Sequence, residues 1–179
     1  MFDDHYMRKR MYMVWRKDII TKAIDDVLHP NSIVDVGCSV GEFVDSFLKM
    51  GKVAYGIDNS ESAKKFFMAP KDNFIMADMT DPKIKISGTP FDLCICFELV
   101  VVLDNSFYNW LADNLCTLSD QILLSVRPER QEGWVERMRS RGYFPYTYVV
   151  NRIREPLEQY KRKAAIKAIY YGMMFFRKG

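Results

Sequence analysis

The sequence predicts an α/β protein with one doubly wound, mostly parallel sheet of about seven strands and helices on both faces. Three observations lead to this fold class. Short apolar runs alternate with helical stretches through most of the 179 residues, a rhythm typical of a parallel sheet covered by helices. One strand runs directly into a glycine-bearing turn and then a helix. The length also suits a single domain, because a core of this size can fold alone.

The first half of the chain supplies these elements in order. We expect one amphipathic helix over residues 6–28, because apolar side chains recur there at three- and four-residue steps and the pattern stops at His29-Pro30. Strands and helices then alternate as strand, helix, strand, helix, strand over residues 32–36, 42–50, 53–57, 61–68 and 74–77. That order predicts parallel strands joined by crossover helices.

The second half completes the sheet. Two more apolar strands are expected at residues 93–97 and 122–126, with a helix at residues 106–118 between them. Helices are expected at 131–141, ending at Gly142, and at 155–165. Between those helices, alternating side chains predict a strand that contains Phe144, Tyr146, Tyr148 and Val150. Residues 168–176 are apolar on both faces and predict a buried last strand.

Composition indicates a protein that folds in water. Hydrophobic residues make up 49% and charged residues 27% of the chain, a balance typical of globular proteins and unlike disordered ones. The longest apolar run is far shorter than the roughly 20 residues of a membrane helix, and the N-terminal residues lack a signal-peptide core. We therefore expect a cytosolic protein. Its four cysteines form no CxxC pair, so we expect no metal site.

Charge is distributed unevenly along the chain. Residues 1–126 hold 13 basic and 18 acidic side chains, whereas residues 127–179 hold 13 basic and 5 acidic ones. The C-terminal third is therefore a basic block on an acidic body. Such asymmetry indicates an anionic partner such as a nucleic acid or a sugar phosphate. The alternative interpretation is a solvated surface that only keeps the protein soluble.

Two features point to a nucleoside ligand. The first is the turn Gly37-Cys38-Ser39-Val40-Gly41, which follows an apolar strand and opens a helix; glycines there let a ligand approach the backbone, and amides at the helix start would face it. The second is Asp58, which ends the next strand 17 residues after Gly41. A carboxylate in that place can accept hydrogen bonds from both ribose hydroxyls. Together the two features are far more specific than a glycine turn alone.

Known dinucleotide and nucleotide motifs do not fit the turn. A dinucleotide fingerprint requires glycines at positions 37, 39 and 42, but the chain has Gly37, Ser39 and Glu42. A Gly-Lys-Ser/Thr phosphate loop is also missing from the sequence. The ligand is therefore expected to be a nucleoside other than NAD or a nucleoside triphosphate.

The turn resembles the first motif of the class I S-adenosylmethionine-dependent methyltransferases, an acidic residue, an apolar residue and Gly-x-Gly-x-Gly. Asp35-Val36-Gly37-Cys38-Ser39-Val40-Gly41 matches it except at Ser39. Asp58, with Asn59 beside it, matches the family's ribose-binding acid, and Ala77-Asp78-Met79 resembles its adenine-binding segment. The resemblance implies S-adenosylmethionine as cofactor, S-adenosylhomocysteine as product, and contacts from Asp35, Gly37, Cys38, Ser39, Gly41, Phe43, Asp58, Asn59, Asp78, Met79 and Phe97.

The fourth-strand segment, Phe91 to Glu98, resembles the motif that lines the methyl-transfer site of this family. The resemblance also implies a Rossmann-like sheet with an antiparallel last strand. Glu98 is the candidate catalytic residue, because burial would raise its pKa and suit proton abstraction. It could equally orient the cofactor or cap a helix, just as Asp78 could be an ordinary loop residue. The family's frequent Glu-His pair is replaced by Val101 and Val102, which removes one expected general base.

We therefore expect a methyltransferase that acts on an oxygen or nitrogen atom of a small-molecule or polymer acceptor. Residues 1–30 would form a helical lid, with Tyr6, Arg8 and Tyr12 as candidates to cover the cofactor and Trp15 in the core. Residues 31–126 would hold the cofactor, and the basic residues 127–179 would face the acceptor. Two alternatives remain: a non-catalytic S-adenosylmethionine-binding or scaffold protein, and a nucleic-acid methyltransferase guided by the basic block.

Overall fold

A computed structural model describes residues 3–12 and 17–179 of the chain. The strands are β1 to β7, at Ser32–Val36, Val53–Asp58, Phe74–Met76, Leu93–Cys96, Gln121–Ser125, Tyr143–Pro145 and Met173–Lys178. In the described part of the chain they form one seven-stranded sheet in the order β3-β2-β1-β4-β5-β7-β6. The pairs from β3 to β5 are parallel, and β7 runs antiparallel to β5 and β6. The predicted fold class, including the antiparallel last strand, is confirmed.

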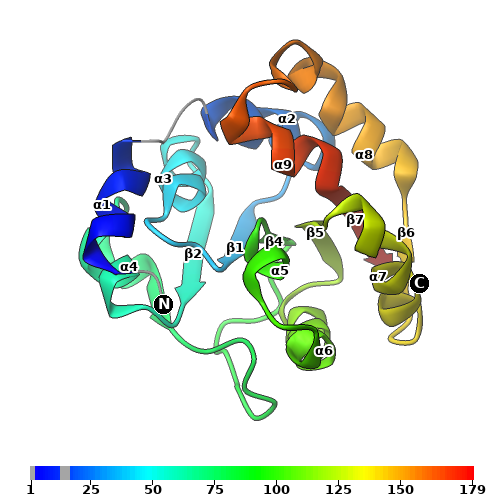
Figure 1. Cartoon of the computed structure of the whole chain (residues 1–179), viewed down its shortest axis with the longest axis horizontal. Coiled ribbons are helices and arrows are strands. Elements are labelled where there is room, and N and C mark those ends of the chain that lie inside the picture. Colours follow the sequence, from blue (N-terminus) through cyan, green and yellow to red (C-terminus); the bar gives the residue numbers. More distant parts are fainter. Residues whose placement is uncertain (1–2, 13–16) are drawn as a thin grey trace.

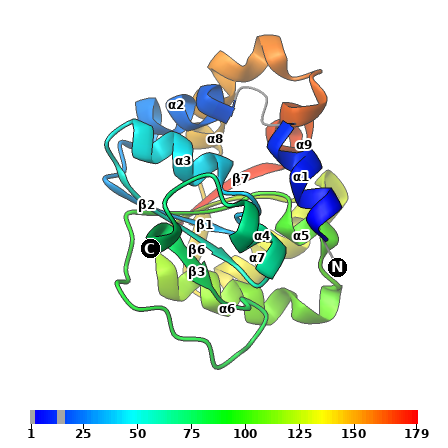
Figure 2. The ribbon, with the colours of Figure 1, turned by 90° about the vertical axis from the view of Figure 1, so that its left-hand side faces the viewer.

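Helices cover both faces of this sheet. One apolar cluster joins the sheet to helices α2, α3, α8 and α9, at Lys17–Leu28, Glu42–Lys49, Thr147–Arg154 and Ala164–Gly172. A second cluster joins the other face to α6 (Tyr108–Leu118) and α7 (Gln131–Arg139). Figure 2 shows α2 and α3 on one side of the strands and α6 on the other. None of the helices in the described ranges is long and apolar enough to span a bilayer.

The alternation within the central strands explains the two clusters. In β4, Leu93 and Ile95 belong to the cluster of α2 and α3, whereas Cys94 and Cys96 belong to that of α6 and α7. All four side chains are at most 1% exposed, since both faces of a parallel sheet are covered. The two cysteines thus share a strand face as small core residues, as their spacing predicts.

Two helices occupy the region where one long helix was expected. Helix α1 spans Asp4–Tyr12 and α2 begins at Lys17; residues 13–16, including Trp15, lie outside the described residues. Helix α1 lies beside α4 (Glu61–Phe66), where Asp4 accepts a hydrogen bond from the Ser62 hydroxyl at 2.5 Å. Helix α2 instead packs on α3 and α8 (Figure 1). The two helices therefore serve different parts of the fold.

Three sequence predictions for the C-terminal third are wrong. Strand β6 ends at Pro145 and α8 follows, where a strand through Val150 was expected. Helical spacing explains the error, because Val150, Ile153 and Leu157 are the buried residues, while Tyr148 is 72% exposed. The expected helix at 155–165 is a 3-10 helix, η4, at Glu155–Tyr160, and the expected strand at 168–176 is mostly α9 followed by β7.

The last strand nevertheless has the environment that was predicted. Strand β7 lies between β5 and β6, inside the sheet. Its residues Met173 to Phe176 are all at most 8% exposed, so the run is buried on both faces.

The remaining short helices are η1 (Lys71–Asn73), α5 (Leu99–Val102), η2 (Asn105–Phe107) and η3 (Pro128–Arg130). The last three follow β4 and β5 at the edge of the sheet where the strands end.

Candidate functional site

A cavity of about 590 Å³ opens at the carboxyl ends of β1, β2 and β4. Its volume lies in the range of small-molecule sites, about 300–1,000 Å³. The sheet order reverses direction at β1, which pairs with β2 on one side and β4 on the other. Ligands of open α/β sheets bind at such a point. Helix α1 and helix α5 both contribute side chains to the cavity wall.

The structure separates the predicted cofactor residues into two groups. The cavity is lined by Gly37, Ser39, Asp58, Asn59, Asp78, Met79, Phe97 and the candidate base Glu98. Four predicted residues lie behind this wall, namely Asp35, Cys38, Gly41 and Phe43. The first group comes from the ends of four strands, so the sheet itself brings these residues together.

The amides of the glycine turn are used inside the protein. Gly37 and Cys38 both donate their N–H groups to the carbonyl of Ile57, at 2.8 and 3.1 Å. Ser39 donates to Asp58 Oδ2 at 2.9 Å, and Gly41 donates to the carbonyl of Cys38 at 2.9 Å. These four turn amides therefore do not face a ligand, while the prediction for the amides at the start of α3 stays a prediction. A turn with this pattern offers little to a phosphate group, which needs free N–H donors.

The glycines and Ser39 of the turn are in the left-handed region. The φ angles are 76° at Gly37, 52° at Ser39 and 77° at Gly41, values that glycine adopts without a steric cost. A Cβ at Gly41 would also lie 2.2 Å from the ring of Phe67, and one at Gly37 would lie 3.0 Å from Leu99 Cβ. Glycine at position 41 is therefore required by packing under the turn. Of these two glycines, only Gly37 both has a close contact for an added Cβ and lines the cavity.

Packing also explains Cys38. Its side chain is buried behind the turn, and a Cβ on Gly56 would lie 2.6 Å from its sulfur. Burial, followed by the charges of Asp35, Asp58 and Glu42, raises the pKa of this thiol well above its usual value. Cys38 is therefore a neutral packing residue that needs the glycine opposite it.

Asp58 holds the turn and still faces the cavity. Its Oδ2 accepts the Ser39 amide and its Oδ1 accepts the Ser60 amide at 3.0 Å. Burial raises the pKa of Asp58, and the backbone hydrogen bonds only partly oppose that effect. A carboxylate offers about four acceptor positions, so acceptor capacity remains after the Ser39 and Ser60 amides are bound. Asp58 is thus a fixed acceptor that can still bind hydroxyl groups.

Asp78 and Asn59 form a second polar pair on the cavity wall. Asn59 Nδ2 donates to Asp78 Oδ2 at 3.2 Å, and Thr80 donates its amide and hydroxyl to Asp78 Oδ1 at 2.9 and 2.7 Å. Burial acts to raise the pKa of Asp78, but the bonds from Thr80 and Asn59 outweigh it and lower the pKa. Part of its hydrogen bonding is therefore the ordinary loop chemistry that the sequence allowed.

Glu98 lies at the end of β4 in a conformation that is unusual for a non-glycine residue. Its φ is 65°, and its amide donates to the Ser125 hydroxyl at 2.8 Å. The side chain is 38% exposed and its Oε2 lies 3.6 Å from Arg10 Nη1. The expectation that Glu98 is buried is wrong, because α5 turns away directly after it.

Arg10 is the cavity residue that the sequence did not reveal. It is the only cation among the described lining residues, and its Nη2 donates to Glu42 Oε1 at 2.7 Å. It therefore joins α1 to the start of α3 and to Glu98. Sequence reasoning missed it because it stands in the basic run Arg8-Lys9-Arg10, where nothing distinguishes one residue from another. Of the proposed lid residues, Tyr6 lines the cavity, Arg8 stacks over Phe66 and the side chain of Tyr12 lies outside the described residues.

Several charges lie buried beneath the cavity. Asp35, Glu42 and Lys17 are each at most 4% exposed. Burial, followed by the charges of Glu42 and Asp58, raises the pKa of Asp35 well above its usual value. Burial likewise lowers the pKa of Lys17. The Oε2 of Glu42 has no hydrogen-bond partner among the described residues.

The remaining wall is apolar and comes from the segment after β4. It consists of Leu99, Val101, Val102, Leu103 and Phe107. Val102 is 56% exposed, so this wall borders the opening. No described residue of the basic block 127–179 lines the cavity.

Comparison with known proteins agrees with this geometry. A family model described as a methyltransferase domain matches residues 34–110. No curated protein matches the chain. Among solved structures, a TehB-like S-adenosylmethionine-dependent methyltransferase from Corynebacterium glutamicum aligns with a TM-score of 0.64 at 19% identity, over 80% of this chain and 86% of that one.

Two further structures share the fold. Magnesium protoporphyrin IX methyltransferase from Synechocystis, solved with bound S-adenosylmethionine, aligns with a TM-score of 0.61 at 18% identity, over 79% of this chain and 74% of that one. The methyltransferase domain of bacterial CtHen1 aligns with a TM-score of 0.61 at 14% identity, over 73% and 87%. Residues 34–110 of the chain therefore match a methyltransferase domain, and the chain shares the fold of these S-adenosylmethionine-dependent methyltransferases.

Proposed function

We propose that the chain transfers the methyl group of S-adenosylmethionine to an oxygen or nitrogen atom of a small anionic acceptor. The observation that carries this proposal is the Asp58 carboxylate, fixed by two backbone amides at the wall of a 590 Å³ cavity. Ribose hydroxyls are donors that such a carboxylate binds. The matching family model over residues 34–110 supports the same activity.

The chemistry of the turn fits a nucleoside cofactor without phosphate. The amides of Gly37, Cys38, Ser39 and Gly41 are all used by acceptors within the protein. A pyrophosphate would find no free donor among these four amides. S-adenosylmethionine carries no phosphate, so the arrangement favours it over NAD.

The rest of the cavity supplies groups for each part of this cofactor. Asp58 would accept the ribose hydroxyls, and the buried side chains of Met79 and Phe97 would provide an apolar place for adenine. Asp78, with Asn59, would meet the adenine amino group. Arg10 would attract the carboxylate of the methionine part, since it is the only cation among the described lining residues.

The protein's catalytic contribution is mainly positioning. When bound, S-adenosylmethionine supplies a methyl group that its sulfonium already activates. The apolar wall of Val101, Leu103 and Phe107 would exclude water and hold the acceptor in line. Helix α1 would act as the lid on the other side, and residues 31–126 would hold the cofactor. Helix α2 packs on α3 and α8, so only the α1 part of the expected lid 1–30 lies at the cavity, and a role of residues 127–179 toward the acceptor would have to come from outside its lining.

Glu98 is the candidate general base. It is the carboxylate at the end of β4, and its partial exposure leaves it in contact with both the cavity and solvent. Its Oε2 lies 3.6 Å from Arg10 Nη1, a contact that would orient the carboxylate. An oxygen or nitrogen acceptor would lose its proton to this carboxylate as the methyl group is transferred.

Methyl transfer from labelled S-adenosylmethionine to separate classes of small acceptor tests the proposal. With the correct class, Glu98→Gln should lower kcat by about a hundredfold or more, while the affinity for S-adenosylhomocysteine changes little. Glu61→Gln, an exposed glutamate of α4, is the matched control and should leave kcat unchanged. Full activity in Glu98→Gln would exclude Glu98 as the base. Tight cofactor binding with no transfer to any class would favour a binding or scaffold protein.

A further inference from the structure

A second hollow, of about 230 Å³, lies on the side of α6 and α7. It is formed where the segment after β4 meets the segment after β5. The first segment contributes Asn105 and Tyr108, and the second contributes Glu129, Arg130, Trp134 and Arg137. We call it the arginine hollow. None of these residues has a role in the cavity described above.

Two guanidinium groups of the hollow flank one aromatic ring. The central carbons of Arg130 and Arg137 lie 5.9 and 5.5 Å from the ring centroid of Tyr108. Arg130 also donates to the Tyr108 hydroxyl. Both guanidinium carbons thus lie within about 6 Å of the same ring centroid, and both residues line the hollow.

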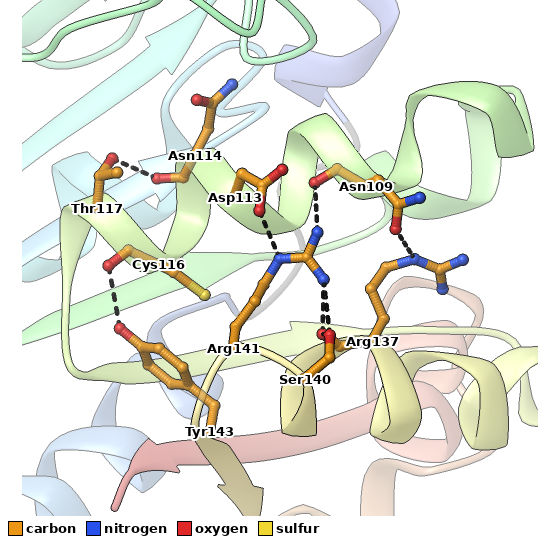
Figure 3. Close-up of polar contacts among 9 residues, drawn as sticks. All are labelled: Asn109, Asp113, Asn114, Cys116, Thr117, Arg137, Ser140, Arg141 and Tyr143. Carbon is orange, nitrogen blue, oxygen red and sulfur yellow. Dashed lines mark hydrogen bonds and ion pairs between the residues drawn. The ribbon is translucent and has the colours of Figure 1, made fainter.

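Neither arginine forms an ion pair with a carboxylate within 4.0 Å in the described part of the chain. At longer range, Arg137 interacts with the charge of Glu136, and Arg130 interacts with the charge of Asp104. Arg137 donates its Nε to Asn109 Oδ1 at 2.9 Å (Figure 3). Its Nη1 donates to the carbonyl of Gly133 at 3.0 Å, so both acceptors are neutral. A guanidinium has five N–H donors, so each arginine keeps donors that these bonds do not use. The hollow thus has two positive charges and N–H donors that these hydrogen bonds leave free for a ligand.

Arg141, one turn further along the chain, shows the opposite arrangement. Its Nε donates to Asp113 Oδ1 at 2.6 Å, and its other nitrogens donate to the carbonyls of Arg137 and Asn109 at 2.7 and 3.2 Å (Figure 3). It is a paired, structural arginine that ties α7 to α6. Burial, followed by the charge of Arg141, lowers the pKa of Arg137. An anion beside Arg137 would relieve this repulsion.

Trp134 adds to the arginine hollow an N–H donor that has no acceptor among the described residues. The residue lines the hollow and is fully buried, with Arg137 stacked over its ring at 5.5 Å. Its indole Nε1 is buried and has no hydrogen-bond partner among the described residues. Buried donors of folded proteins are nearly always paired, so this one is consistent with an absent acceptor.

We propose that the arginine hollow binds a phosphate group of the methyl acceptor. The planar forks of two arginines match the geometry of phosphate oxygens. The hollow is smaller than the 300–1,000 Å³ typical of whole-ligand sites, so it suits one small group of a larger molecule. This inference rests on the proposed methyl transfer, because it assigns that group to the acceptor.

The two sites are close enough to serve one molecule. In the one-turn helix η2, Asn105 lines the arginine hollow and Phe107 lines the main cavity. Residues two apart in a chain are separated by about 7 Å at most. An acceptor whose phosphate lies in the hollow could therefore extend past η2 and present its nucleophilic atom at the methyl-transfer site.

The surroundings favour a small phosphate ester over a nucleic acid. Helix α7 carries Glu132 and Glu136 among its arginines, and Glu129 lines the hollow itself. A polymer backbone would need a continuous basic track. Alternating charges with one arginine pair fit a single phosphate instead.

Calorimetric titration with inorganic phosphate at constant ionic strength tests this inference. Arg130→Gln and Arg137→Gln should each weaken phosphate binding roughly tenfold, because each removes a charged hydrogen-bond donor. Glu129→Gln should strengthen it, because the substitution removes the one carboxylate among the described lining residues. Arg139→Gln, an exposed arginine of the same helix, is the control for net charge and should change it by less than twofold.

The affinity for S-adenosylhomocysteine, measured on the same samples, should stay the same in all four variants. Equal phosphate binding by the wild type and both arginine variants would overturn the phosphate site while leaving the methyltransferase proposal intact. Tighter binding of a short single-stranded oligonucleotide than of phosphate, lost in Arg137→Gln, would overturn the small-acceptor assignment. Failure of the wild type to bind S-adenosylhomocysteine would instead contradict the proposed function. Circular dichroism confirms that each variant is folded, and Glu129→Gln changes only an exposed side chain.

Discussion

The main-chain N–H of Ser39 donates to Asp58 Oδ2 at 2.9 Å, which joins the glycine turn after β1 to the end of β2. Because Ser60 holds the other carboxylate oxygen, Asp58 cannot move without disturbing both strand ends. The turn therefore acts as a support that positions a carboxylate through the Ser39 amide, while the amides of Gly37 and Cys38 bind the Ile57 carbonyl. This relationship explains why the two sequence features belong to one site.

The first prediction concerns pH and Asp35. Burial raises the pKa of Asp35 well above the ordinary value of 3.8, so the folded protein retains a proton at pH values where the unfolded chain has lost it. The free energy of unfolding should therefore fall as the pH rises from about 4 through the folded-state pKa. Urea denaturation should show a flatter pH profile for Asp35→Asn than for the wild type.

The exposed Asp72 provides the control for this profile. Asp72→Asn changes a carboxylate of η1 that lies on the surface, and its pH profile should follow that of the wild type. If Asp35→Asn also follows the wild type, then Asp35 is not protonated preferentially in the folded state.

The second prediction concerns the ion pair between Arg10 and Glu42. Arg10→Gln leaves the Glu42 carboxylate, which is 3% exposed, without its 2.7 Å partner. We expect a loss of about 2 kcal/mol in stability, less than for a fully buried pair because the Arg10 side chain is 24% exposed. Adding Glu42→Gln should recover part of that loss in a double-mutant cycle.

A surface pair serves as the comparison. Lys22 and Asp26 are 71% and 56% exposed, so Lys22→Gln should cost less than about 1 kcal/mol. Equal losses for Arg10→Gln and Lys22→Gln would show that the contact between α1 and α3 contributes no more than an ordinary surface pair.

Most of the central fold could be predicted because its signals are local. The apolar runs at β1, β2, β4 and β5 indicate strands that have buried residues on both faces. The glycine turn and Asp58 lie next to the ends of such strands. Alternation misled the prediction after Pro145, where Tyr146 and Tyr148 are 43% and 72% exposed. There the helical spacing of the buried residues in α8 was the better signal.

Other parts of the site depend on contacts that are distant in sequence. Arg10 reaches Glu42 and Glu98 only because α1 lies over the strand ends. The reason for glycine at position 41 is the ring of Phe67, 26 residues later. Nothing local to Arg10 or Gly41 carries that information, so only the assembled fold could supply it.

The third prediction separates strain from packing at two glycines. Gly41 and Gly51 have φ angles of 77° and 76°, but a Cβ meets Phe67 at 2.2 Å in the first case and nothing within 4 Å in the second. Gly51→Ala should cost about 1–2 kcal/mol from the left-handed backbone alone. Gly41→Ala should cost about 1–3 kcal/mol more, because the ring must move. Equal melting temperatures for the two variants would contradict the proposed packing role of Gly41.

The most direct test of the account is calorimetric titration of S-adenosylhomocysteine into the wild type, Asp58→Ala and the control Asp72→Ala. We predict one site in the wild type and in Asp72→Ala. In Asp58→Ala the affinity should be at least tenfold weaker, because each hydrogen bond to a charged group contributes roughly 1.5–3 kcal/mol. Unchanged affinity in a folded Asp58→Ala protein, or no binding to the wild type, would contradict the assignment of this cavity to the cofactor.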